Sequence, residues 1–151
     1  MTAHPQALNQ DLKSPTLADA ERYVGKPYIE GVFDCADLAA QVQWELFGVV
    51  IELPTQRARP HSPRAQARAI AAFAPKVVQQ IAAPAHGCGV LMWESAAIES
   101  GANRQWHIGT AFLQNGEVWV LHSTVQAGAV LHRLPDLGRF GLHVEGFYQW
   151  M

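Results

Sequence analysis

The first half of the chain carries its hydrophobic residues at helical spacing. Over residues 35–47, Leu38, Val42 and Leu46 recur every fourth position, which predicts one buried face of an amphipathic helix. Asp34 precedes this segment and is a favourable N-cap, while the glycine after the segment is suited to end a helix. The pattern therefore predicts a helix whose first turn contains a cysteine.

Two further helices are expected on either side of this one. A short helix begins near Leu17, with Ser14 or Thr16 as its cap. A longer helix is expected over residues 62–81, where alanines and a phenylalanine recur at helical spacing, with a break or kink at a proline.

The second half of the chain has the alternation and turn chemistry of strands. Two runs flank the dipeptide Asn115-Gly116, which predicts a hairpin with a two-residue turn. The expected strands cover residues 90–93, 107–113, 117–122, 129–134 and 144–150. Because helices come first and strands follow without alternation, we expect an α+β fold in which the helices pack on one side of a small antiparallel sheet or half-barrel of about five strands.

Composition narrows the classes of protein. The 151 residues are 49% hydrophobic and 16% charged, with a formal net charge of −2, which is typical of one globular domain and shows no basic excess for nucleic acid. No apolar run is long enough to cross a membrane, and no export signal is visible, so the chain is expected to be cytoplasmic when synthesised. Residues 1–14 are expected to form a flexible arm and residues 15–151 a single domain.

Two interpretations of Cys35 are open at this point. At the start of a helix, unpaired backbone N–H groups favour the thiolate, which makes a reactive nucleophile. Alternatively, Cys35 is a small buried hydrophobic residue, as free cysteines often are. Without an export signal, Cys35 and Cys88 are expected to be free thiols rather than a disulfide.

A nucleophilic cysteine needs a base and an orienting partner, and seven histidines compete for these roles. His107 and His122 stand at the two ends of the predicted hairpin, so pairing brings their rings to the same end of the sheet. They fit a base and its orienter, or two half-buried strand ends. A zinc site with Cys88 is a further alternative, and His132 and His143 are expected to be surface or edge residues.

Six short motifs in order resemble the NlpC/P60 cell-wall cysteine peptidases over roughly residues 16–150. They are Gly25-Lys26-Pro27-Tyr28, Asp34-Cys35, Leu53-Pro54, Gly87 and Gly89 before Val90-Leu91-Met92-Trp93, His107-Ile108-Gly109, and His122-Ser123. The resemblance implies a papain-like fold in permuted order, with the helix-borne cysteine packed against the sheet. The whole of residues 15–151 is then one catalytic domain.

The resemblance also implies roles for individual residues. Cys35 would be the nucleophile, His107 the general base and acid, and His122 the residue that orients His107. Tyr28 would line the oxyanion site with the Cys35 backbone N–H. The remaining residues expected near the site are Asp34, Asp37 and Trp106. The reaction implied is hydrolysis of amide bonds in peptidoglycan stem peptides, typically after D-glutamate, without a metal or another cofactor.

One departure from the family pattern opens alternatives. The family commonly has Asp-Cys-Ser-Gly, whereas this chain places Asp37 one turn from the thiol, and a nearby negative charge disfavours a thiolate. A catalytically idle tail, assembly or wall-binding protein of the same fold is therefore an alternative, as is an amidase or acyltransferase on another small substrate. The short form is similar to phage-tail and prophage-encoded members, so phage-tail proteins are expected partners and delivery to the wall would be by a tail or by lysis.

Overall fold

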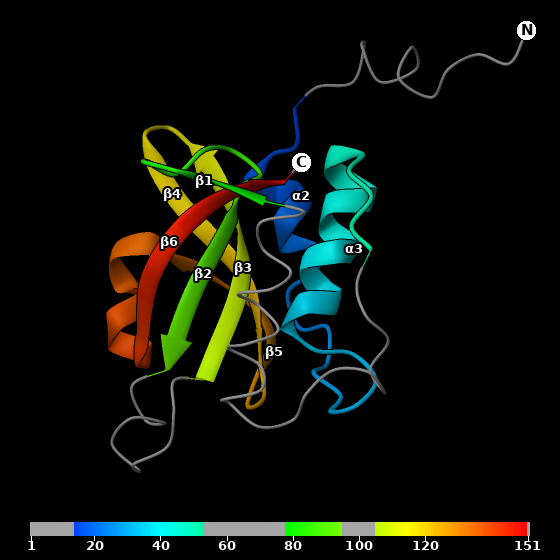
Figure 1. The fold of residues 1–151 in the computed structure, drawn as a ribbon. Coiled ribbons are helices and arrows are strands. Elements are labelled where there is room, and N and C mark those ends of the chain that lie inside the picture. Colours follow the sequence, from blue (N-terminus) through cyan, green and yellow to red (C-terminus); the bar gives the residue numbers. More distant parts are fainter. Residues whose placement is uncertain (1–13, 53–77, 95–104, 151) are drawn as a thin grey trace, which may run out of the picture.

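In the described part of the chain, two N-terminal α-helices and one 3-10 helix pack on an antiparallel sheet. The computed structural model describes residues 14–52, 78–94 and 105–150 (Figure 1). Its elements are α2 (Leu17–Glu21), α3 (Cys35–Phe47), β1 (Val78–Ile81), β2 (Gly89–Glu94), β3 (Gln105–Gln114), β4 (Glu117–Thr124), β5 (Gly128–Arg133), the 3-10 helix η2 (Leu134–Phe140) and β6 (Leu142–Trp150). The α+β class predicted from the sequence is confirmed.

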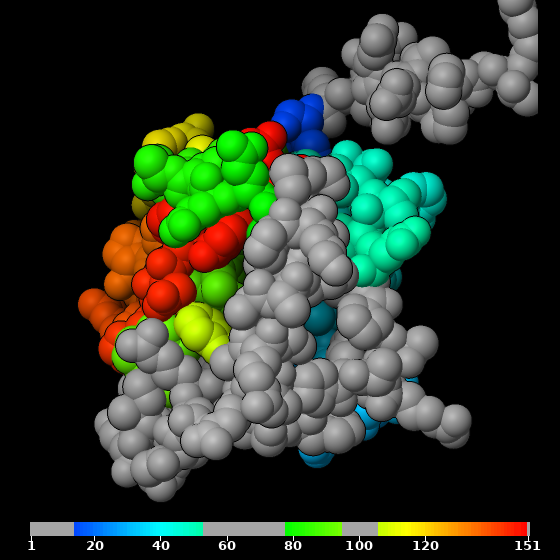
Figure 2. Space-filling view, viewed as in Figure 1, coloured from blue at the N-terminus to red at the C-terminus, as the bar shows by residue number. Residues whose placement is uncertain are grey.

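The sheet has six strands among the described residues, not about five. Its order is β1-β6-β2-β3-β4-β5, and every neighbouring pair is antiparallel. The additional strand is β1, which pairs along β6 from Val78↔Trp150 to Ile81↔Phe147. Figure 2 shows β1 and β6 next to each other on the surface of the molecule.

The end of the predicted helix over residues 62–81 is wrong, because residues 78–81 are strand β1. Helical spacing of the preceding alanines does not extend past the proline, and the β-branched Val78 and Ile81, both half-buried, favour a strand. Residues 62–77 lie outside the described part of the chain. So do most of the expected arm and the Leu53-Pro54 motif.

The predicted helix over residues 35–47 is confirmed, with the expected signals at both ends. Asp34 accepts from the N–H groups of Ala36 and Asp37, and the Asp37 carboxylate accepts from the Asp34 N–H, which is a complete capping box. Gly48 ends the helix in the left-handed region with φ 67°. The shorter helix α2 is capped by Thr16, one of the two expected residues.

The predicted hairpin is also confirmed. Asn115 and Gly116 are the only two residues between β3 and β4, and both have positive φ, 52° and 77°. This is the geometry that a two-residue primed turn requires. The turn fixes the register Gln114↔Glu117, which runs without interruption to Gly109↔His122.

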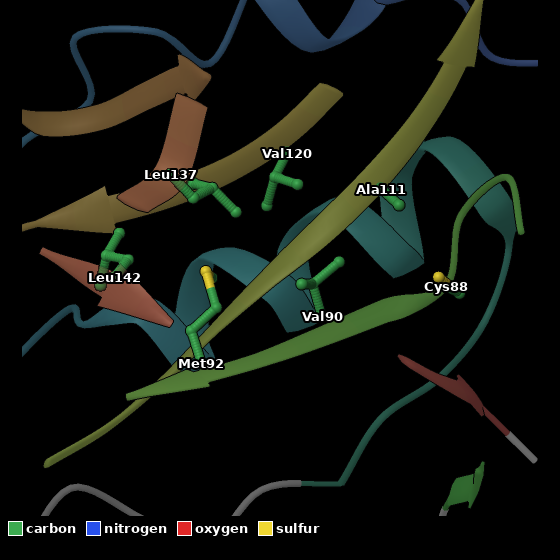
Figure 3. Close-up of a cluster of buried hydrophobic side chains, with 7 residues drawn as sticks. All are labelled: Cys88, Val90, Met92, Ala111, Val120, Leu137 and Leu142. Atoms are coloured by element: carbon green, nitrogen blue, oxygen red, sulfur yellow. The ribbon is translucent and has the colours of Figure 1, made fainter. Parts of the chain in front are cut away.

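Hydrophobic side chains pack on both faces of the sheet. On one face, Leu38 and Val42 of α3 pack with Phe112 and Leu121. On the other face, a second cluster lies under η2, and its side chains point into the space between β2, β3, β4 and η2 (Figure 3). Its members are Cys88, Val90, Met92, Ala111, Val120, Leu137 and Leu142. Thus α2 and α3 cover one side of the sheet and η2 the other (Figure 1).

None of the helices in the described part of the chain has the length and apolar character that a membrane span requires.

Candidate active site

The candidate nucleophile is the first residue of α3. Cys35 is a half-buried cysteine outside any disulfide, and it follows directly on the N-cap. The carboxylate of Asp37, expected to oppose a thiolate, is hydrogen-bonded to the Asp34 backbone N–H at 2.9 Å. The first role of Asp37 is therefore to hold the helix start, although its charge remains two residues from Cys35 along the helix.

Tyr28 lies close enough to Cys35 for a negative charge on that cysteine to raise the pKa of the phenol. Burial raises the pKa of Tyr28 to about 12, and the negative charges of Cys35 and Asp34, followed by those of Glu30 and Glu94, act in the same direction. The phenol therefore stays protonated near neutral pH and is able to donate a hydrogen bond. Because Glu94 ends β2, Tyr28 is within electrostatic reach of both the start of α3 and that end of β2.

His107 and His122 lie at the same end of the sheet, as the hairpin predicted, and their rings are in direct contact. The Nε2 of His107 lies 2.8 Å from the Nδ1 of His122, and the two rings are nearly perpendicular, at 86°. Both side chains are buried. This hydrogen bond uses one nitrogen of His107 and leaves its Nδ1 outside the pair.

Gly109 makes room for this pair between the two strands. It stands opposite His122, and a Cβ at this position would come within 2.6 Å of a methyl group of Val120 and 3.2 Å of the His122 Cβ. Contacts that short require the neighbouring strand to shift. A glycine is thus required where β3 and β4 approach closely beside the histidine pair.

His132 lies half-buried on the edge strand β5, which agrees with its interpretation as an edge residue, but it also contacts the histidine pair. Its Nδ1 lies 3.0 Å from the Nε2 of His122, and its ring stacks on Phe140 at 3.9 Å with an angle of 7°. We call His107, His122 and His132 the histidine row. The sequence signal for this contact is the alternation of side chains along a strand. Val120 shares a face of β4 with His122 and stands opposite His132, so His132 and His122 lie on the same face of the sheet.

All three rings of the histidine row are electrically neutral at neutral pH. Burial lowers the pKa of His107 to about 4. Burial also lowers the pKa of His122, with a further contribution from the charges of its two neighbours. Burial lowers the pKa of His132, opposed by the carboxylate of Asp136. Each neutral ring carries one N–H and one lone pair.

Trp106 and Cys88 lie away from this row. Trp106 is next to His107, but successive strand residues face opposite sides, so its indole is on the α3 side of the sheet. Its Nε1 is buried without a hydrogen-bond partner among the described residues. The backbone of Cys88 pairs with that of Ala111, four residues and about 13 Å along β3 from His107.

The zinc alternative finds no support in this arrangement. The thiol of Cys88 is buried in the hydrophobic cluster, and burial raises its pKa. In the described ranges, no three His, Cys, Asp or Glu side chains are grouped as metal ligands would be.

Comparison of the chain with protein-family models, with curated proteins and with solved structures finds no match.

Proposed function

We propose that the protein is a cysteine peptidase that hydrolyses amide bonds of peptidoglycan stem peptides, with a permuted papain-like core of the NlpC/P60 type. The observation that carries the proposal is the 2.8 Å hydrogen bond between His107 Nε2 and His122 Nδ1. It supplies the two members of a triad that a nucleophile at the start of α3 requires, a base and the residue that orients it.

The packing of α3 supports a meeting of Cys35 with His107. The far end of the helix is level with Phe112, because the rings of Phe47 and Phe112 are in contact at 5.7 Å. Twelve helical residues back from Phe47 is about 18 Å. Five strand residues back from Phe112 to His107 is about 17 Å. Both paths lead to the same end of the sheet, where α3 and β3 begin (Figure 1).

The sheet also opens at this level. The ladder between β3 and β4 ends at Gly109↔His122, although β3 begins at Gln105 and β4 continues to Thr124. Beyond that pair the two strands separate, β3 staying with β2 and β4 with β5. Such an opening is where the Nδ1 of His107 would reach the thiol from the opposite face of the sheet.

The chemistry assigned to these groups is acyl transfer. The Cys35 sulfur attacks the amide carbonyl, its proton passes to Nδ1 of His107, and the oxyanion accepts hydrogen bonds from the Tyr28 hydroxyl and the Cys35 N–H. His107 then gives the proton to the departing amine, which leaves a thioester. Water, deprotonated by His107, hydrolyses the thioester and restores the thiol.

The test is the release of fragments from a stem peptide containing a γ-D-glutamyl-diamino acid bond, followed by mass spectrometry. Wild-type protein and Cys88→Ala should release the same products, whereas Cys35→Ala and His107→Gln should release none. Cys88→Ala is the matched control, because it removes the other thiol. Equal losses from both cysteine variants would refute the assignment of Cys35 as nucleophile.

A second candidate is a catalytically idle protein of the same fold, whose cleft only binds. The burial of the His107 ring favours this second candidate. Burial lowers the pKa of His107 to about 4, which disfavours the imidazolium that would stabilise a thiolate. Alkylation rates near neutral pH distinguish the two candidates. The peptidase requires Cys35 to react much faster than the buried Cys88, and equal, slow rates would favour the idle protein.

In either case, peptidoglycan is the proposed partner, and phage-tail proteins are proposed as carriers. The experiment that bears on this is co-sedimentation of the Cys35→Ala variant with purified cell wall. If the protein is instead an amidase or acyltransferase on another small substrate, it should release no product from the stem peptide.

A further inference from the structure

Resting on the proposed function, we propose that His132 is a positioning residue that fixes the tautomer of His107 through His122. The third ring of the histidine row would hold the base in the one protonation pattern that leaves its Nδ1 able to accept a proton from Cys35. The proposed triad consists of Cys35, His107 and His122 and gives His132 no role.

The geometry of the row is continuous. Nε2 of His107 is 2.8 Å from Nδ1 of His122, and Nε2 of His122 is 3.0 Å from Nδ1 of His132. Both nitrogens of the middle ring are therefore engaged with other imidazoles. Phe140 stacks on His132 at 3.9 Å, which holds the outer ring in place.

Only two neutral patterns satisfy both hydrogen bonds, because each contact needs one hydrogen and each neutral ring has one. In the first pattern every ring carries its hydrogen on Nε2: His107 donates to His122, and His122 donates to His132. In the second pattern every ring carries its hydrogen on Nδ1, and donation runs the opposite way. The tautomers of the three rings are therefore linked, and the outer ring decides the state of the inner one.

The surroundings of His132 favour the first pattern. The negative charge of the Asp136 carboxylate acts to raise the pKa of His132, against the effect of burial. Ion pairs with Arg133 at 3.0 Å and Arg139 at 3.9 Å hold this carboxylate in place. Since the Nδ1 of His132 is turned toward His122, we place the hydrogen of His132 on its other nitrogen, Nε2. The hydrogen on His122 then lies on Nε2, and so does the hydrogen on His107.

The two patterns have opposite chemical consequences at the inner end. With its hydrogen on Nε2, His107 presents a lone pair at Nδ1, which is what a base facing Cys35 requires. With its hydrogen on Nδ1, His107 has no lone pair to offer there. Without an acceptor at residue 132, both patterns become accessible and part of the protein loses its base.

Two substitutions separate this role from a packing role. In His132→Asn, the side-chain oxygen stands where Nδ1 stood and still accepts from His122. In His132→Leu, the volume is kept but the acceptor is lost. His143→Leu is the matched control, because His143 is an exposed ring that stacks on Trp93 at 4.1 Å, on another strand of the same sheet.

The experiment records long-range ¹H–¹⁵N correlations of the imidazoles in the full ¹⁵N-labelled chain. The wild type, His132→Asn and His143→Leu should show His107 and His122 with hydrogen on Nε2, and His132→Leu should show a second form with hydrogen on Nδ1. With the stem peptide, His132→Leu should lower kcat about 10- to 100-fold at an unchanged KM, and His132→Asn should restore most of it.

Hydrogen on Nδ1 of His122 in the wild type would overturn the inference, even if neither variant folds. It is equally overturned if His132→Leu folds and keeps the wild-type tautomers. Failure of the proposed function has a different signature: the wild type cleaves no stem peptide, while the ring nitrogens still show whether His132 sets the tautomer.

Discussion

Lowering the pH should destabilise the protein through the histidine row, and His107 allows the magnitude to be worked out. Its pKa is about 4 in the folded protein against the ordinary value of 6.5. The unfolded chain therefore binds a proton at a higher pH than the folded protein does. Stability is fully present above pH 6.5 and is lost as the pH falls toward 4.

For one group with these two pKa values, the free energy of unfolding falls by about 2 kcal/mol between about pH 7.5 and about pH 5. His122 contributes a loss of the same sign, since burial lowers its pKa as well. A protein of this size has a total stability of about 5 to 15 kcal/mol, so the effect is a large fraction of it.

The assay is urea unfolding followed by circular dichroism at the two pH values, for the wild type, His107→Asn and His143→Asn. The His107→Asn variant cannot take up this proton, so its loss of stability between the two pH values should be about 2 kcal/mol smaller than that of the wild type. The control His143→Asn should keep the wild-type loss. Parallel pH dependence in the wild type and His107→Asn would show that the ring is not held neutral by burial.

Two further predictions concern the residues around the pair and the thiol. Gly109→Ala should lower the free energy of unfolding by about 1 to 3 kcal/mol, because its new methyl group presses on β4, whereas Gly138→Ala meets no atom within 4 Å and should cost little in the same urea titration; equal costs would contradict the close approach. Asp37→Asn keeps an acceptor for the helix cap but removes a charge, so alkylation of Cys35 by iodoacetamide should become a few-fold faster while that of Cys88 is unchanged. An unchanged Cys35 rate would mean that the carboxylate has no influence on the thiol.

The parts of the fold that were predictable from the sequence are those whose signals are local. Helix α3 has its cap, its buried stripe and its terminal glycine within fifteen residues, and each signal indicates the same element. The hairpin of β3 and β4 was predicted from Asn115-Gly116, because few other dipeptides adopt positive φ at both positions. Once the turn was placed, the position of His107 and His122 at the same end of the hairpin followed from counting.

Features that depend on distant partners were not predictable in the same way. Strand β1 exists because Val78–Ile81 pairs with β6 at the far end of the chain, and its own residues carry no turn signal that separates them from the preceding helical pattern. The third histidine of the row required the register between β4 and β5. A one-residue slip of that register would have turned His132 to the opposite face.

Tyr28 is a proposed site residue for which sequence and structure contribute different things. Its candidacy came from a motif, Gly25-Lys26-Pro27-Tyr28, that has no periodicity and no element of its own. The structure adds the physical part, a half-buried phenol whose pKa is about 12 by burial and by the charges of Cys35 and Asp34. Its protonated hydroxyl is able to donate a hydrogen bond to an oxyanion, which a carboxylate in the same position would not do.

The acid sensitivity and the proposed tautomer control have one physical origin. The two buried rings and the half-buried ring of His132 are accommodated in the fold because each hydrogen bond within the row satisfies a donor and an acceptor. Both hydrogen bonds are satisfied in this way only while the rings are neutral. The folded protein therefore binds protons less readily than the unfolded chain and loses stability in acid. The row also leaves one nitrogen at each end, Nδ1 of His107 and Nε2 of His132, and a hydrogen at one end requires a lone pair at the other. A substitution that breaks the row at His132 should therefore weaken both properties together, which a role in packing alone would not do.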